Sequence, residues 1–172
     1  MHIPSSSVAL LASCFLLILL ATGCKVVDDD DEMEEVKEYV RVGDRLPPFT
    51  VQTVMGDGTP GTFSTARLTG QTVIVFFHTA CSDCQRELPR LNDYYQRHCD
   101  EQGFQMVAIS REEEAESIAA FWQEQGLTLP YSPQPDRSIY SLFASSVIPR
   151  VYVCTAQGVV TQVYIEQLPP DF

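Results

Sequence analysis

Short apolar runs, separated by turn-forming residues, predict a series of β-strands along most of this chain. The strongest run is 71–77, in which every residue from Thr72 to Phe77 is β-branched or aromatic. A strand that is apolar on both faces is typical of the centre of a parallel sheet. Shorter runs predict strands at 49–51, 62–64, 104–109, 147–154 and 159–165. The turn formers at 55–61 and 156–158 predict that the first and last pairs are hairpins.

Two stretches carry apolar residues at the spacing of a helix face. The first is predicted to run from the cysteine at 84 to about 98, with Pro89 kinking it rather than ending it. The second is expected to follow Ser110 as its N-cap, to hold the glutamates 112–114 in its first turn, and to end at Gly126. We expect 127–135 to be irregular and 138–143 to form a short helix.

The predicted order is hairpin, strand, helix, strand, helix, strand, strand. Strands that alternate with helices and then end in a hairpin are typical of an α/β fold with a mixed central sheet and helices on its faces. The length of 172 residues and a hydrophobic content of 45% fit one globular domain.

The first 23 residues contain no Asp, Glu, Lys or Arg, and 8–21 are almost continuously apolar. This is the length of a signal-peptide core and is short for a membrane-spanning helix. The run ends at Ala21-Thr22-Gly23-Cys24, which resembles the lipobox of bacterial lipoproteins. We therefore expect 1–23 to be a lipoprotein signal peptide and Cys24 to be lipidated; an uncleaved anchor or an ordinary secretory signal is the alternative.

An acidic block at 28–35 supplies much of the formal net charge of −12. Like charges repel and stay solvated, so we expect 24–38 to be a lipidated acidic tether and 39–172 to be the folded domain. The charge argues against nucleic acid or an anionic lipid surface as a ligand. It also resembles the surface-export signal of Bacteroidetes lipoproteins. The expected location is the cell envelope, on the periplasmic face of a bacterial outer membrane, with surface exposure left open.

Six cysteines divide by context. Cys14 would leave with the signal peptide and Cys24 would take the lipid, so four remain in the folded domain. Cys81 and Cys84 form a Cys-x-x-Cys pair directly after the strongest strand and at the start of the first helix. A thiol pair at such a junction indicates redox chemistry.

With this order of elements, the chain resembles the thioredoxin superfamily, and within it the exported, membrane-tethered thiol:disulfide oxidoreductases called TlpA-like. The resemblance covers roughly 42–165. It is carried by Val42-Gly43-Asp44-x-x-Pro47-x-Phe49, Phe76-Phe77 before Cys81-x-x-Cys84, Glu87-Leu88-Pro89, and Ile148-Pro149. It implies a thioredoxin-like fold and an enzyme that exchanges disulfides with protein substrates, more as reductant than oxidant, and is recharged by a membrane electron donor. No cofactor and no metal are expected.

Several positions depart from the family. An aromatic residue usually precedes the first cysteine, where this chain has Ala80, and the family's usual Ala two residues earlier is His78. Thioredoxin's buried Asp is replaced by Val75. Only seven residues follow the last predicted strand, so we expect the C-terminal helix to be missing or reduced, and a partner chain to cover the sheet face that it leaves.

Cys81 is expected to attack and Cys84 to resolve, because a cysteine at a helix N-terminus gains from unpaired amides and the helix dipole. Together they would form the redox-active disulfide. Between them, the carboxylate of Asp83, next to Ser82, should oppose thiolate formation and favour a reducing couple. Glu87 lies three residues after Cys84 on the same helix face, and the resemblance implies that it accepts the proton of the buried thiol. A solvated helix charge is the alternative.

The resemblance also implies that Pro149 is a cis-proline facing the disulfide and that Ile148 helps to bind an extended substrate. His78 could stabilise the thiolate when charged, or could be a structural residue at a strand end. Cys99 and Cys154 are expected at the pole away from the active site, either as two separate buried thiols or as a second disulfide.

Three other functions remain open. A peroxiredoxin shares the fold but needs Thr three residues before its cysteine, where this chain has His78 and places Thr79 one residue later. Structural zinc on His78, Cys81, Cys84 and Cys99 lacks a second close ligand pair. A non-catalytic surface lipoprotein that keeps the fold as a scaffold is the third.

Overall fold

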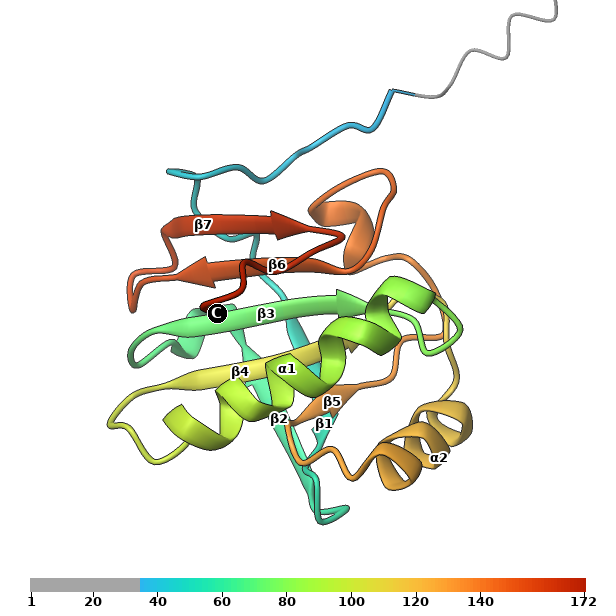
Figure 1. The fold of residues 1–172 in the computed structure, drawn as a ribbon. Coiled ribbons are helices and arrows are strands. Elements are labelled where there is room, and N and C mark those ends of the chain that lie inside the picture. The colour runs from blue at the N-terminus through green and yellow to red at the C-terminus, as the bar shows by residue number, and fades with distance from the viewer. Residues whose placement is uncertain (1–34) are drawn as a thin grey trace, which may run out of the picture. The chain divides into compact units, whose positions relative to one another are not determined.

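One seven-stranded mixed sheet organises residues 35–172, which are the residues that this computed structural model describes (Figure 1). The strand order is β2-β1-β5-β4-β3-β6-β7. The strands are β1 (Thr50–Val54), β2 (Pro60–Ser64), β3 (Thr72–Phe77), β4 (Gln105–Ser110), β5 (Tyr131–Ser132), β6 (Arg150–Cys154) and β7 (Val160–Ile165). The helices are α1 (Ser82–His98) and α2 (Ala115–Gln125), with short 3₁₀ turns η1 (Thr65–Arg67) and η2 (Tyr140–Leu142). The expected signal peptide and Cys24 lie outside the described residues.

The predicted mixed sheet and both hairpins are confirmed. The wholly buried β3 lies between parallel β4 and antiparallel β6, so it is the central strand that its apolar run predicted. Helix α1 continues through Pro89 and ends at His98, as expected. None of the helices in residues 35–172 has the length and apolar character needed to cross a membrane.

Two local predictions are wrong. The segment expected to be irregular contains β5, which pairs with β4 through Tyr131 and Ser132 and with β1 through Tyr131, and so joins the first hairpin to the rest of the sheet. Ser110 does not cap α2. The N-cap is Glu114, and the Ser110 hydroxyl instead accepts a hydrogen bond from the backbone N–H of Gln134 at 2.7 Å. The expected short helix near 140 is a single 3₁₀ turn.

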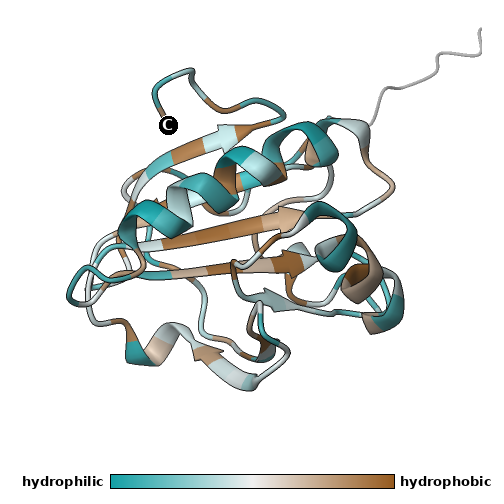
Figure 2. Ribbon diagram, turned by 60° about the horizontal axis from the view of Figure 1, so that its bottom comes forward, coloured by the Kyte–Doolittle hydropathy of each residue, from teal (hydrophilic) through white to brown (hydrophobic). Residues whose placement is uncertain are grey.

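Both α-helices lie on one face of the sheet rather than on the two faces that the pattern predicted (Figure 1). Strands β3, β4 and β5 are parallel neighbours in that order, and right-handed connections that step in one direction place their helices on one side. Figure 2 shows that the central strands are largely hydrophobic, whereas much of the helices is hydrophilic. Leu88 and Leu91 of α1 and Ile118 and Trp122 of α2 are buried.

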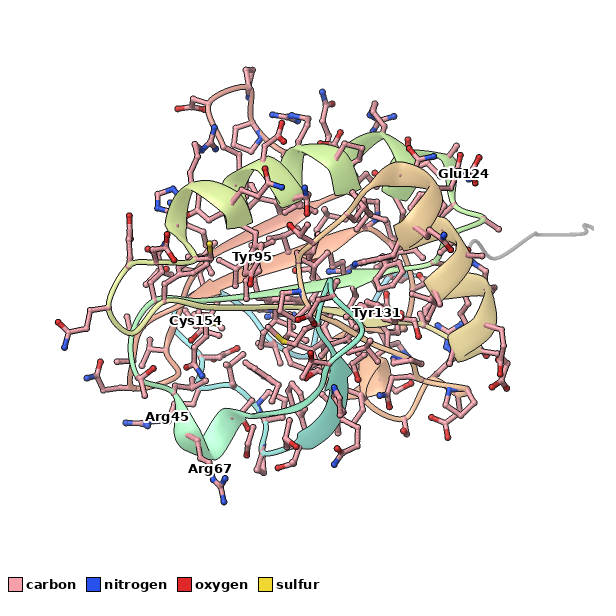
Figure 3. All side chains as sticks on the ribbon, turned by 90° about the horizontal axis from the view of Figure 1, so that it is seen from below. Arg45, Arg67, Tyr95, Glu124, Tyr131 and Cys154 are labelled. Atoms are coloured by element: carbon pink, nitrogen blue, oxygen red, sulfur yellow. The ribbon has the colours of Figure 1, made fainter. Side chains whose placement is uncertain are left out.

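The opposite face is covered by residues 38–49 and η2. Backbone N–H groups of Tyr39 and Val40 both donate to the carbonyl of Phe143, at 2.9 and 3.2 Å. The Phe143 ring packs on Phe76 of β3 with ring centroids 4.7 Å apart, and on Phe49 at 5.9 Å. This half of the core is therefore closed by aromatic packing. Figure 3 shows the interior filled by side chains, with Tyr131 among them and Arg45 and Arg67 pointing outward.

No helix follows β7 within the described residues, as expected, and cover of the sheet face by a partner chain stays a prediction. The chain's own residues 166–172 lie along α1, where arginines donate to tail carbonyls: Arg90 to Leu168 at 3.3 Å and Arg97 to Phe172 at 3.2 Å. The Leu168 side chain is 3% exposed, and the Phe172 ring packs on Tyr94 with centroids 4.6 Å apart. An extended tail thus takes the place of the C-terminal helix that the family usually has, because seven residues with two prolines can bury apolar side chains without forming a helix.

Candidate functional site

Cys81 is the N-cap residue of α1, directly after the loop that leaves β3. Its backbone is extended, with φ −83° and ψ 119°, and its Sγ accepts a hydrogen bond from the backbone N–H of Cys84 at 3.4 Å. The thiol is half-buried, so reagents can reach it. The N-terminus of α1 thus supplies a backbone hydrogen-bond donor to this sulfur.

Cys84 lies one turn further along and is wholly buried. Burial and the hydrogen bond with Cys81 raise the pKa of the Cys84 thiol far above its ordinary value, and the charge of Arg111 acts in the opposite direction. Because the charged form is costly there, Cys84 stays protonated until a reaction removes its proton. The two thiols therefore differ in access, because Cys81 is half-buried and Cys84 is wholly buried.

A loop from the other end of the chain faces the pair. The Ile148–Pro149 peptide is cis, as the resemblance implied. The Ile148 carbonyl accepts from the Cys81 thiol at 3.6 Å. The preceding Val147 has φ 74°, a left-handed conformation that is strained for a β-branched residue. Its carbonyl is held by the hydroxyl of Tyr140 at 2.8 Å and by Nε of Arg150 at 3.0 Å.

An open cleft of about 500 Å³ lies over Cys81. Its lining includes His78, Arg111, Ile148 and Glu166. Three non-glycine residues between 35 and 172 have positive φ: Val147 and Glu166 line this cleft, and Glu112 follows Arg111. Strained backbone gathers where surrounding contacts hold it, commonly at functional sites, so the cleft is the candidate active site.

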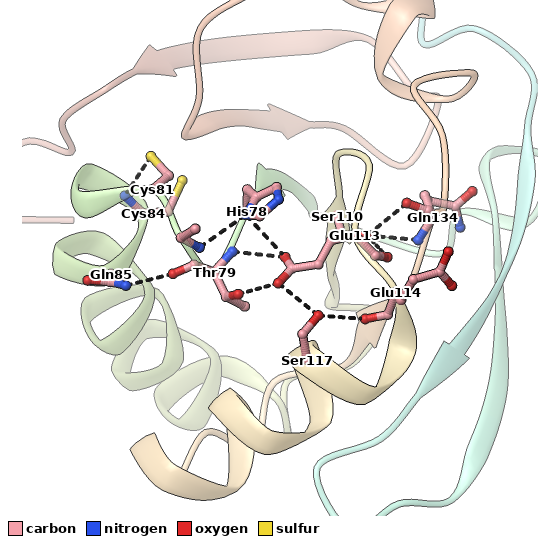
Figure 4. A network of polar contacts seen from close by, with 11 residues as sticks. His78, Thr79, Cys81, Cys84, Gln85, Ser110, Glu113, Glu114, Ser117 and Gln134 are labelled. Atoms are coloured by element: carbon pink, nitrogen blue, oxygen red, sulfur yellow. Dashed lines mark hydrogen bonds and ion pairs between the residues drawn. The ribbon is translucent and has the colours of Figure 1, made fainter.

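A buried carboxylate holds the loop between β3 and Cys81 (Figure 4). Glu113, 6% exposed, accepts from the backbone N–H of Thr79 at 2.9 Å, from the Thr79 hydroxyl, and from Ser117 at 3.1 Å. The carbonyl of Thr79, in turn, accepts a hydrogen bond from the side-chain amide of Gln85 at 2.7 Å. The sequence pattern had assigned Glu113 to the first turn of a helix. That assignment is wrong, because α2 starts two residues later and this side chain turns inward.

His78 belongs to the same network. Its Nδ1 accepts from the backbone N–H of Ala80 at 3.0 Å and lies 3.6 Å from a carboxylate oxygen of Glu113 (Figure 4). The ring is part of the loop structure and also lines the cleft. These contacts show the structural role of His78, and its role as a partner of the Cys81 thiolate stays a prediction.

Glu87 is buried, with 1% exposed, so it is not a solvated helix charge. Its oxygens accept from Nε of Arg86 at 2.9 Å and from Arg90 at 2.7 Å. Arg86 also pairs with Asp83 at 2.6 Å, so the negative charge next to the thiols has a partner. Ser82 begins the helix between the cysteines. Neither oxygen of Glu87 accepts a hydrogen bond from Cys84, so proton transfer between them requires a rotation of the carboxylate or a bridging water.

The other two described cysteines do not meet. Cys99 and Cys154 are both free thiols. Cys154 is buried at the end of β6, as expected, but Cys99 is exposed at the end of α1, so the expectation that it is buried is wrong. Cys99 ends the helix that Cys81 begins, roughly 25 Å away at 1.5 Å per residue. Within 35–172 no group of three or more His, Cys, Asp or Glu side chains gathers as metal ligands.

Comparisons with known proteins agree with this geometry. The model of the AhpC/TSA family matches residues 42–163. The chain is 26% identical over 152 residues to the thiol-disulfide oxidoreductase ResA of Oceanobacillus iheyensis, covering 88% of this chain and 78% of that protein. It is also 30% identical over 125 residues to a candidate peroxiredoxin of Mycobacterium tuberculosis, covering 72% of this chain and 76% of that protein.

The fold has solved counterparts. A candidate protein disulfide isomerase from Bacteroides thetaiotaomicron superposes with a TM-score of 0.69 at 24% identity, over 78% of this chain and 84% of that one. The expected thioredoxin-like fold, with its mixed sheet and N-terminal hairpin, is thereby confirmed.

Proposed function

This chain belongs to the AhpC/TSA family, and we propose that it acts as a thiol-disulfide oxidoreductase on protein substrates through Cys81 and Cys84. The observation that carries the proposal is the contrast between the two thiols. One is accessible at a helix N-terminus under an open cleft, and the other is buried one turn behind it. This is the arrangement that a two-step exchange requires.

In the reducing direction, the Cys81 thiolate attacks one sulfur of a substrate disulfide and releases the other sulfur as a thiolate. Cys84 then gives up its proton and attacks Cys81, which forms the Cys81–Cys84 disulfide and releases the second substrate sulfur. The substrate gains two electrons and the cysteine pair loses two. A membrane electron donor would restore the dithiol. Glu87 is the proposed proton acceptor for Cys84. Ile148, which lines the cleft and precedes the cis-proline Pro149, is the proposed contact for an extended substrate.

We propose the reducing direction because burial makes the Cys84 thiolate costly, so ionisation of Cys84 does not stabilise the dithiol state. Asp83 contributes less to this preference than its charge alone would, because Arg86 partly balances that charge. Titration in glutathione buffers tests the direction. We expect a potential closer to that of thioredoxin, about −270 mV, than to that of DsbA, about −120 mV; a value near the latter would overturn it.

A peroxiredoxin is the second candidate, because one relative at 30% identity carries that description. The local structure favours disulfide exchange. The hydroxyl of Thr79 donates to Glu113, and His78 occupies the position where a peroxiredoxin needs Thr. Peroxide consumption by Cys84→Ser separates the two. A peroxidase would retain its first step, whereas a dithiol exchanger would accumulate a mixed disulfide with its thiol substrate.

We further propose that the protein is exported and anchored through lipid on Cys24, on the periplasmic face of a bacterial membrane. The support is the pattern of residues 1–24 and the acidic segment behind it. Detergent phase partition of the full chain and of Cys24→Ser, expressed in a bacterium, tests this. The full chain should enter the detergent phase and the variant should keep its signal peptide; equal partition and equal processing would contradict lipidation.

A further inference from the structure

Arg111 stands over the active-site cleft without a carboxylate partner in the part of the chain that the structure describes. It follows β4 and lines the cleft together with Cys81 and Ile148. The ion pairs of residues 35–172 use other arginines, and the Nε of Arg111 is buried with no hydrogen-bond partner among those residues. A guanidinium with donors to spare, beside a reactive sulfur, can bind a ligand.

The side chain is held in place rather than free to turn away. Its guanidinium lies over the ring of Tyr140, with 5.4 Å from Cζ to the ring centroid. Tyr140 is itself fixed, because its hydroxyl donates to Val147 at 2.8 Å. The backbone N–H of Arg111 donates to Phe77, the last residue of β3, at 2.8 Å. The charge therefore has a defined position relative to the Cys81 loop.

The other charged groups at the cleft do not neutralise it. Glu113 is occupied by Thr79 and Ser117 and lies near His78. Glu166 lines the cleft but forms no ion pair with Arg111 within the described residues. A planar guanidinium favours a carboxylate, which it can bind with two parallel hydrogen bonds.

We propose that Arg111 binds a carboxylate of the substrate, carried within a residue or two of the sulfur that Cys81 attacks. This rests on the proposed function, since it describes the substrate of the same cleft. The carboxylate belongs either to an acidic side chain of a polypeptide or to a low-molecular-weight disulfide. Arg111 is thus a specificity-determining residue, and the acidic substrate should react faster than its neutral counterpart by about 5- to 10-fold.

The experiment compares two disulfide-bonded peptides that differ only by Asp or Asn next to the cysteine, with glutathione disulfide as the low-molecular-weight arm. Arg137→Gln is the matched control. Arg137 lies over the same Tyr140 ring at 5.4 Å but pairs with Glu112 at 3.3 Å and does not line the cleft. Arg111→Gln should abolish the preference for Asp, Arg111→Lys should retain part of it, and Arg137→Gln should leave it intact.

Each outcome decides one question. If wild type reduces both peptides at equal rates and Arg111→Gln also reduces glutathione disulfide as fast as wild type, or if Arg111→Gln keeps the preference for the Asp peptide, the inference is overturned while the proposed function stands. If no peptide is reduced, the proposed function fails. If Arg111→Gln slows the reduction of glutathione disulfide but of neither peptide, the carboxylate that Arg111 binds belongs to a low-molecular-weight disulfide. Raising the salt concentration should reduce the preference, because the charges are partly exposed.

Discussion

Replacing Glu87 by Gln removes a buried carboxylate without changing its size. The side chain is 1% exposed and accepts from Arg86 at 2.9 Å and from Arg90 at 2.7 Å. The amide retains one oxygen acceptor but can neither balance two positive charges nor take up a proton. Glu87→Gln therefore tests a structural role and a chemical role together, and the two can be measured separately.

The structural cost should be modest. Breaking a fully buried pair by removing one partner costs about 3–5 kcal/mol. Here the Arg86 side chain is 52% exposed and that of Arg90 is 33% exposed, so water screens both cations. Both also donate to carbonyls of the C-terminal tail, contacts that the variant keeps. We expect the free energy of unfolding in urea to fall by about 1–2 kcal/mol.

The chemical effect should be larger and confined to one step. Because burial raises the pKa of Cys84, its attack on the mixed disulfide needs a proton acceptor, and general bases contribute about 10²- to 10⁴-fold. Rapid mixing with dithiobis(nitrobenzoic acid) resolves the two steps, since Cys81 releases the first thiolate and Cys84 the second. A Cys99→Ser background removes the exposed third thiol. We expect the second phase to slow about 100-fold and the first to change less than about threefold.

Asp83→Asn is the control, since it removes the exposed carboxylate that shares Arg86 and should leave the second phase nearly unchanged. If Glu87→Gln leaves the rate of that phase and its pH profile as in wild type, Glu87 is only structural and the proposed proton transfer is wrong. A loss of both phases together would also contradict it.

Three further variants test the structure itself. Burial raises the pKa of Cys154 to about 12 from 9.0, so the folded state keeps a proton that the unfolded state releases above about pH 9. The free energy of unfolding should therefore fall by about 1.4 kcal/mol per pH unit between about pH 9 and 12. In urea titrations, Cys154→Val should lack this part of the pH dependence. Tyr140→Phe removes a hydroxyl bonded to Val147 and should cost about 1 kcal/mol in urea unfolding. Tyr152→Phe removes a buried hydroxyl without a partner among the described residues, so its effect on the free energy of unfolding should be neutral or stabilising. An equal loss of stability in Tyr140→Phe and Tyr152→Phe would contradict this difference.

The central part of the fold could be predicted from the apolar pattern. The run from Thr72 to Phe77 is long and unbroken enough to identify β3 and, with Cys81 and Cys84 behind it, the junction that holds the thiols. Very short strands could not be predicted from this pattern. Strand β5 has two residues, too few to show a period, and exists because Tyr131 bridges two strands that are distant in sequence.

The partners of the site residues could not be predicted for the same reason. Glu113 stands in a run of three glutamates, and only the loop geometry turns it inward to Thr79 while its neighbours stay exposed. Arg111 carries no sequence signal at all, because its role depends on Tyr140 lying beneath it. Glu87 was identified from its spacing to Cys84, but its arginine partners follow from burial.

The most direct test of the account uses Cys84→Ser in a Cys99→Ser background, mixed with a disulfide-bonded peptide and analysed by mass spectrometry. Without the resolving thiol, the first step should stop at a stable mixed disulfide. We predict one peptide adduct, located on Cys81, that the single Cys99→Ser protein does not accumulate. No adduct on Cys81, or an equally fast adduct on Cys84 in the reciprocal Cys81→Ser variant, would contradict the assignment of Cys81 as the attacking thiol.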